Sequence, residues 1–458
     1  MLLATCAVAG AQAPRATGGP FDGLFRGSPR EQPQTLDLRG SAFGAWDDNV
    51  LAQAPNGPGS FNLVPNTLKP GLANGFQAGL SYGLRTSGTR SQVVISGNGS
   101  IQEFASTANS NSLLFQNYDA TAAFRTNITP KVSMTFGGQS SYMPFYQYLP
   151  FLANTASENS PVSNDVGYAV NSTWVRSEGV SASIEDRFTK KTSISGTVGW
   201  DQRFLTADQT KLNTDSASMR LTHNLTRKFS FHIGYGVTEA RYSTRTNNAE
   251  PFRQGFIDFG FGYGDGLTLT FDRYYTLTLS VGASIAKNGD EKSVLATGKQ
   301  TQFLVNGSAT LSRSLGRSGW DASIGYVRGT SYVIGFTEPF NLDTANAGIS
   351  GPIFARLFFS TGAGATRGQQ IFAQAGSITA YTGSARLNFA LVSHLGLYAQ
   401  ASYYKYAIPN ALELFGFMPQ LERHSVTVGI NAWMPLLKQP RQRRPRRGRN
   451  EPSTTENQ

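Results

Sequence analysis

Residues 275–285 read Tyr-Thr-Leu-Thr-Leu-Ser-Val-Gly-Ala-Ser-Ile, and this stretch decides the fold class. Its odd positions are apolar, and its even positions carry Thr, Ser or Gly. Side chains that alternate with a period of two lie on opposite faces of a β-strand. The stretch therefore predicts a strand with one apolar face and one small, polar face.

The same alternation recurs from Thr35 to Leu436. It is clearest in residues 131–139, 192–200, 228–237, 395–403 and 424–434. Short polar turns join these strands in pairs, and longer stretches rich in Gly, Asn, Ser and Pro separate the pairs. The pattern predicts one opening strand, seven hairpins and one closing strand, about 16 strands in all, with residues 331–376 as the longest loop.

An open sheet of this size would leave two exposed edges, and closing it into a barrel removes them. The apolar faces then point either inward, as in a soluble barrel or sandwich, or outward to lipid. The second arrangement is favoured by the small and mostly uncharged polar face, by aromatic residues near strand ends and by the alternation of short turns with long loops. We therefore expect an all-β protein: a single closed antiparallel transmembrane β-barrel with short periplasmic turns and long extracellular loops.

Composition agrees with this expectation. Charged residues make up only 15% of the 458 residues, against about 25% in ordinary soluble domains. No apolar run approaches the roughly 18 residues of a membrane-spanning helix. The aromatic share of 12% disfavours a disordered chain.

At this point the chain resembles bacterial outer-membrane β-barrel proteins of the porin-like kind. The resemblance lies in the strand pattern of residues 229–236, 275–285 and 426–434. It implies localisation in the bacterial outer membrane, contact with outer-membrane lipid and lipopolysaccharide, and insertion by the barrel-insertion machinery. We expect no plug domain before the barrel, because only about twenty residues separate the export signal from the first strand. The aromatic residue that ends many such barrels corresponds to Trp433, but further residues follow it here.

The two ends of the chain differ from the barrel. Residues 1–13 resemble the apolar part of a secretory signal peptide without its basic n-region, so we expect a truncated start, and they contain Cys6, the only cysteine. Residues 14–34 form a flexible leader rich in Gly and Pro, and the barrel spans 35–436. Residues 437–458 form a basic, disordered tail that holds a net charge of +5 out of +11.

The tail is expected in the periplasm, where it faces a periplasmic protein, the cell wall or an acidic glycan, or forms a solvated extension without function. The export signal excludes nucleic acid as its partner. Its arginines are Arg441, Arg443, Arg444, Arg446, Arg447 and Arg449.

Strand parity places a set of ionisable residues on the polar face, where they would line the lumen. Acids and bases sometimes share a strand, so these residues either create a transverse field for solutes or pair with one another and hold the wall. The candidates are Asp37, Arg39, Asp119, Arg125, Glu185, Asp201, Arg203, Arg220, Asp258, Asp272, Asp321, Arg386 and Arg423.

Two predicted loops are apolar enough to enter the lumen. The loop at 144–152 follows the fifth strand, and the resemblance to porins implies that it folds inward as a constriction. Its candidate residues are Phe145, Tyr146, Tyr148 and Phe151. The longer loop at 331–376 caps or fills the lumen, binds an external ligand, or projects beyond the membrane as a self-packed loop or short strand pair.

Catalysis has little support in the sequence. The four histidines form no HExxH motif, no GxSxG motif is present, and no Cys/His spacing suits a metal. The glycine-rich residues 260–266 lack the Lys-Ser/Thr of a phosphate loop. We expect no enzymatic activity, no cofactor and no metal.

Two functions remain after these exclusions. The first is a channel for passive passage of small polar solutes or for export of a saccharide. The second is a non-conducting surface or assembly protein with a loop-filled lumen and a tail that docks a periplasmic partner.

Overall fold

The computed structural model contains 18 β-strands and describes residues 34–48, 71–85, 91–104, 113–144, 174–206, 209–226, 229–243, 252–263, 275–287, 301–315, 319–333, 339–372, 377–407 and 420–437. The strands are β1 Gln34–Asp47, β2 Gly71–Arg85, β3 Ser91–Phe104, β4 Leu113–Asn127, β5 Val132–Pro144, β6 Trp174–Asp186, β7 Thr192–Leu205, β8 Lys211–Asn224, β9 Phe229–Ser243, β10 Phe252–Tyr263, β11 Tyr275–Lys287, β12 Thr301–Ser314, β13 Asp321–Ser331, β14 Phe340–Phe354, β15 Leu357–Gln370, β16 Ser377–Val392, β17 Leu395–Ala407 and β18 Gln420–Pro435. No helix in the described ranges is long and apolar enough to cross a membrane.

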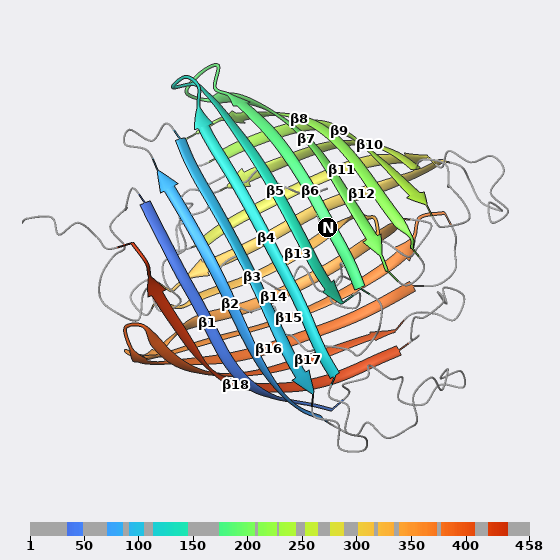
Figure 1. Cartoon of the computed structure of the whole chain (residues 1–458). Coiled ribbons are helices and arrows are strands. Elements are labelled where there is room, and N and C mark those ends of the chain that lie inside the picture. The colour runs from blue at the N-terminus through green and yellow to red at the C-terminus, as the bar shows by residue number, and fades with distance from the viewer. Residues whose placement is uncertain are drawn as a thin grey trace, which may run out of the picture.

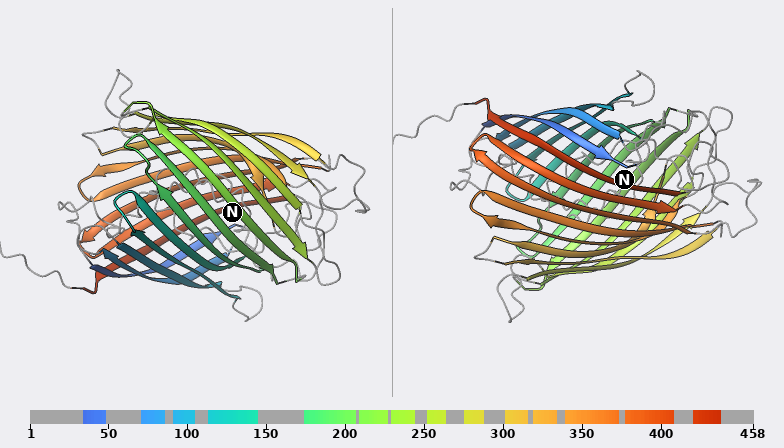
Figure 2. Two further views of the ribbon diagram at one scale, coloured as in Figure 1. Left: turned by 90° about the horizontal axis from the view of Figure 1, so that it is seen from above. Right: turned by 90° about the horizontal axis from the view of Figure 1, so that it is seen from below.

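Every strand pairs antiparallel with its neighbours in sequence, and β18 pairs with β1 to close the sheet. The closing register runs from Asp37 opposite Pro435 to Asp47 opposite Ser425. Figures 1 and 2 show the resulting barrel, in which the tilted strands of the front wall cross those of the back wall. The predicted closed antiparallel β-barrel is thereby confirmed.

The barrel has two strands more than the predicted 16, because residues 340–370 form the hairpin β14–β15 inside the predicted long loop. Its two-residue connection, 355–356, is as short as the predicted turns. On the lipid side this hairpin carries small residues such as Ala345, Ala347, Ala363 and Ala365, so its alternation is weak in the sequence.

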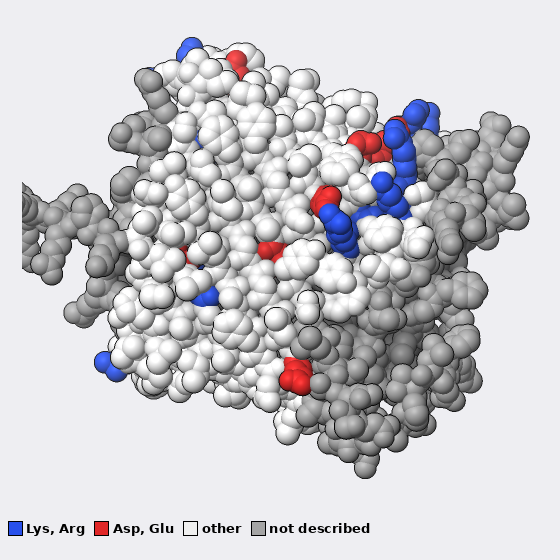
Figure 3. Space-filling model, viewed as in Figure 1, with Lys and Arg blue, Asp and Glu red and all other residues white. Residues whose placement is uncertain are grey.

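The outer surface of the barrel is apolar. Large apolar side chains point away from the strands all around the wall, including Leu72 at 68% exposure, Phe303 at 67% and Val281 at 63%. Figure 3 shows that charged groups are sparse over most of the viewed wall. Polar residues such as Ser284, Thr344 and Gln400 are buried on the opposite, inner face. This arrangement is that of a transmembrane barrel and excludes the soluble alternative.

Aromatic residues form a ladder on the outside, at the ends where strands meet the long connections. Tyr142 of β5 stacks on Tyr118 of β4 and on Trp174 of β6, with ring centroids 5.4 and 4.9 Å apart. Interfacial girdles of membrane barrels occupy such positions. The aromatic residues near strand ends do not all lie in this girdle, because Tyr242 and Trp433 stand at inner-face positions of β9 and β18.

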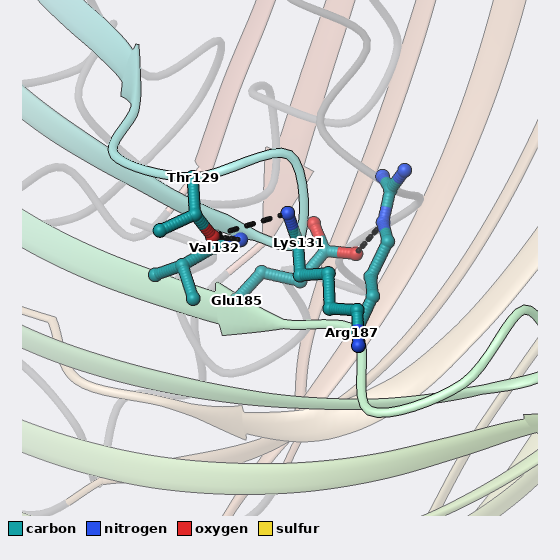
Figure 4. A network of polar contacts seen from close by, with 5 residues as sticks. All are labelled: Thr129, Lys131, Val132, Glu185 and Arg187. Atoms are coloured by element: carbon teal, nitrogen blue, oxygen red, sulfur yellow. Dashed lines mark hydrogen bonds and ion pairs between the residues drawn. The ribbon is translucent and has the colours of Figure 1, made fainter.

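Three turns at the opposite end of the barrel are stabilised by the same kind of hydrogen bond from backbone N–H groups to a threonine hydroxyl. The hydroxyl of Thr129 accepts hydrogen bonds from the backbone N–H groups of Lys131 and Val132, at 3.2 and 3.0 Å (Figure 4). Thr189 accepts equivalent bonds in the turn between β6 and β7, and Thr226 accepts one in the turn between β8 and β9. A hydroxyl that satisfies turn amides stabilises a tight reversal, so the strands of each pair start in fixed register.

Glycines on the inner wall accept large side chains from the neighbouring strand. A Cβ atom added to Gly75 would lie 2.3 Å from the ring of Phe43, and one at Gly236 would lie 2.2 Å from the ring of Phe256. Each ring therefore lies flat on the strand beside it, which keeps bulky side chains against the wall.

Candidate functional site: the barrel lumen

The inner wall carries most of the predicted lumen-lining charges. The strand registers place Asp37, Arg39, Asp119, Arg125, Glu185, Asp201, Arg203, Arg220, Asp258, Asp321, Arg386 and Arg423 on the face that points into the barrel. Asp272 lies outside the described residues, as do the constriction candidates Phe145, Tyr146, Tyr148 and Phe151, the tail from 438 onward and residues 1–33.

A half-buried cluster lies on the inner wall of β8, β9 and β10. Arg220 donates from Nη2 to Oδ2 of Asp258 at 2.7 Å, and Nε2 of His232 lies 3.2 Å from the same oxygen. Asp258 reaches both partners because Gly234 stands beside it: a Cβ there would lie 1.9 Å from its carboxylate oxygen. The alternation in the sequence predicts Arg220 and Asp258 on the inner face. His232 shares this face and is not among the predicted residues.

Two further contacts fix charges to the wall. Arg423 of β18 donates through Nε to Oδ2 of Asp47 at 2.6 Å, and this buried pair joins the last strand to the first. The Arg386 guanidinium lies 4.4 Å from the ring centre of Tyr398 and donates to Asn388 at 3.0 Å. Asp47 was missed in the sequence because it stands at the boundary of a predicted loop.

At the end with the long connections, β13 leaves its neighbour and enters the lumen. It pairs with β12 only as far as Arg328, opposite Gly307, although β12 continues to Thr301. Beyond that point β13 stays paired with β14 up to Ser331, opposite Phe340. We call residues 330–333 and 339–342 the luminal partition, because their contacts reach the inner faces of distant strands.

A buried ion pair anchors the partition to β7. Nε of Arg203 lies 2.6 Å from Oδ1 of Asp201, and both side chains are only 3% exposed. Nη1 of Arg203 donates to the backbone carbonyl of Tyr332 at 2.8 Å. The pair therefore connects strands whose contacting residues are 129 positions apart in the chain.

A second anchor lies on β10. The hydroxyl of Tyr332 donates to Oε1 of Gln254 at 2.8 Å, and Nε2 of Gln254 donates to Ser284 and Thr330 at 2.8 and 2.9 Å. Burial, and secondarily the nearby Tyr242, raises the pKa of Tyr332 well above its usual value. The hydroxyl therefore stays protonated at neutral pH and remains a donor to Gln254.

Apolar packing completes the partition. Val333 and Phe340 are fully buried, and the Tyr332 ring lies 5.7 Å from the ring of Phe252. Phe372, just after β15, also packs against Phe252 at 5.6 Å. The apolar cluster continues to inner-face residues of β6, β7, β8, β9, β11, β16 and β17, namely Val175, Leu205, Leu212, Ala240, Tyr242, Ala286, Ile378, Ala380, Tyr404 and Tyr406. The partition therefore bridges opposite regions of the wall at this level.

Below the partition the wall is polar and suited to contact with water. Its inner face there carries Ser, Thr, Asn and Gly, with contacts such as Asn98 Nδ2 to Asp119 Oδ2 at 3.1 Å and Ser100 Oγ to Asn117 Oδ1 at 2.5 Å. Within the described ranges, no group of three or more His, Cys, Asp or Glu residues could hold a metal ion.

The sequence leaves several arrangements open for residues 331–376, and entry into the lumen is only one of them. No local sequence pattern predicts the polar contacts that anchor the partition, because Arg203, Gln254 and Tyr332 belong to separate hairpins. Tyr332 and Val333 directly follow a predicted strand, and nothing in their neighbours shows that they turn inward.

Comparisons with known proteins show resemblance at a distance. No family model and no curated protein matches the chain. Among solved structures, it is similar to the FrpB iron transporter from Neisseria meningitidis, with 8% identity, a TM-score of 0.43, and coverage of 88% of this chain and 82% of that one. It is also similar to OpdQ from Pseudomonas aeruginosa, with 10% identity, a TM-score of 0.41, and coverage of 88% and 98%. For the ferric-catecholate import receptor Fiu from E. coli the identity is 10%, the TM-score 0.41 and the coverage 89% and 82%.

The architecture itself rests on the geometry of this chain. The sheet is closed, its outer face is apolar and its inner face is mostly polar. At one end the connections between strands have six residues or fewer, except for residues 264–274 between β10 and β11, and the other long connections lie at the opposite end. The chain has the architecture of the bacterial outer-membrane β-barrel proteins.

Proposed function

We propose that this protein is an outer-membrane channel that passes small, uncharged polar solutes by diffusion. The observation that carries the proposal is the inner wall below the partition, which is built from Ser, Thr, Asn, Gln and Gly. Hydroxyl and amide groups on such a wall exchange hydrogen bonds with water and with sugar-like solutes at little cost.

Charge balance supports uncharged solutes. The twelve predicted residues and Asp47 together give seven acidic residues and six arginines on the inner face. Several of these charges neutralise one another directly, as in Asp201–Arg203, Asp258–Arg220 and Asp47–Arg423. A wall of nearly balanced, paired charge gives no strong preference for anions or cations.

Liposome swelling tests this function. Full-length protein, refolded into liposomes, should admit neutral mono- and disaccharides, and the swelling rate should fall as the sugar grows. A small organic cation and a small organic anion of similar size should enter at similar rates. Equal impermeability to all solutes by correctly folded barrels would contradict the proposal, and so would a strong preference for one sign of charge.

The luminal partition favours a second candidate, a non-conducting surface or assembly protein. The partition packs apolar side chains across the lumen and anchors them with buried hydrogen bonds, which is the construction of a permanent core. In this case the basic tail would dock a periplasmic protein, the cell wall or an acidic glycan. Deletion of residues 438–458 would then abolish that binding, and the swelling assay would give no signal.

A further inference from the structure

The outer face of the barrel carries a concentrated group of charges, and smaller pairs such as Arg328–Asp343 and Lys405–Glu422 lie elsewhere on it. The concentrated group spans β6 to β11 at the ends that meet the long connections, and Figure 3 shows charged side chains gathered on that part of the viewed wall. We call it the outer charged cluster; its members, five basic and three acidic, are Arg176, Glu178, Lys211, Asp215, Glu239, Arg241, Arg253 and Lys287.

One carboxylate orients two guanidinium groups at its centre. Glu239 accepts from Nε of Arg241 at 2.8 Å through one oxygen and from Nε of Arg253 at 2.9 Å through the other. The arginine side chains nevertheless stay 57% and 71% exposed. Because each guanidinium has five N–H donors in a planar fork, both groups can still present donors to a ligand outside the wall.

The position of the cluster along the strands indicates what it meets. On the same outer face, Val237 follows Glu239 toward the barrel centre, Ile285 follows Lys287, and Ile257 follows Gly255 after Arg253; all three large side chains are apolar and exposed. Charges on the lipid-facing wall are costly at the bilayer centre and nearly free at the interfaces. The cluster therefore lies at headgroup level, and the long connections place that level in the outer leaflet.

We propose that the outer charged cluster binds the phosphate groups of lipopolysaccharide. Phosphate oxygens match the forked donors of arginine, and the excess of two positive charges attracts an anion. Adjacent strands lie about 4.8 Å apart, so the six strands carry the cluster over about 24 Å, enough for a headgroup with several phosphates. A divalent cation is a poor occupant because both oxygens of Glu239 already accept from arginines.

Binding of lipopolysaccharide to the full-length protein, refolded in detergent free of this lipid, tests the proposal. The variant Arg241→Ala/Arg253→Ala should lose about tenfold or more in affinity, which corresponds to about 1.4 kcal/mol. Arg187→Ala is the matched control. Arg187 is 59% exposed and pairs with Glu185 two positions away (Figure 4), as Arg241 pairs with Glu239. It follows β6 directly and therefore lies at the opposite end of the barrel. This control should bind like the wild type.

A further variant separates phosphate binding from a structural role of the ion pairs. Glu239→Gln should bind lipopolysaccharide at least as tightly as the wild type, because it removes the negative charge that competes with phosphate and so raises the net charge of the cluster by one. If the cluster only holds the strands together, Glu239→Gln should weaken binding as much as the double arginine variant.

Binding of other lipids shows whether the cluster recognises the phosphates of lipopolysaccharide or those of a phospholipid. Dephosphorylated lipopolysaccharide should bind weakly to every variant, and phosphatidylglycerol should bind more weakly than lipopolysaccharide. Equal binding of phosphatidylglycerol, or unchanged affinity in the double arginine variant, would overturn the proposal. Solute entry into liposomes should not change in any of these variants, so this test is independent of the proposed channel function.

Discussion

At the residue scale, the charged groups that anchor the luminal partition are costly to bury, because they have almost no contact with water. Asp201 and Arg203 are almost fully shielded from solvent, and a buried charge is tolerated only when a partner compensates it. Their mutual contact and the bond from Arg203 to the Tyr332 carbonyl supply that compensation. The pair therefore fixes the position of the partition and stabilises it there.

We predict that Arg203→Met destabilises the folded barrel by about 3–5 kcal/mol, because Asp201 is left as an uncompensated buried charge. The double variant Asp201→Asn/Arg203→Met should lose less than Arg203→Met alone, because no charge remains to be buried. Urea unfolding in lipid vesicles, followed by tryptophan fluorescence, measures the free energies. A double variant that is less stable than either single variant would contradict this assignment.

At the element scale, strands with large lipid-facing residues could be predicted from the sequence, and strands with small ones could not. Leu279, Val281 and Ile285 of β11 give a clear alternation, whereas Ala345 and Ala347 of β14 scarcely differ in character from their Gly and Asn neighbours. The sequence therefore predicts a loop where the structure has the hairpin β14–β15. Its place in the barrel depends on pairing with β13 and β16, which no local pattern encodes.

We predict that Ala347→Arg destabilises the barrel by about 2–4 kcal/mol, because Ala347 lies midway along β14 on the lipid-facing side. Gln369→Arg on β15 is the control: it shares that side but lies next to the long connection, where the cost should be about 0–1 kcal/mol. Equilibrium unfolding in vesicles compares the two. Equal costs would show that this hairpin does not cross the membrane.

At the scale of the whole molecule, the residues of the inner wall can be predicted from the alternation of side chains along each strand, but the partition cannot. A register with a period of two assigns Arg220, Asp258 and Arg423 to one face without any knowledge of the barrel's shape. The contact between Arg203 and Tyr332 joins strands that are far apart around the wall, so it exists only once the sheet has closed. The apolar side chains of the partition then bury one another in a lumen that is otherwise polar.

In the proposed channel, the partition is the element that limits passage. Its side chains are held at one end of the lumen, whereas the wall below it is polar. Smaller side chains in the partition should therefore widen the path without changing the lipid-facing surface.

Single-channel conductance in planar bilayers tests this account most directly. The full-length protein should conduct ions, and the variant Tyr332→Ala/Val333→Ala/Phe340→Ala should conduct more, because these three side chains are buried in the partition. Phe303→Ala, which removes a ring from the lipid-facing side, should conduct like the wild type. Folded barrels that carry no current in any form, or equal current with and without the three side chains, would contradict the account.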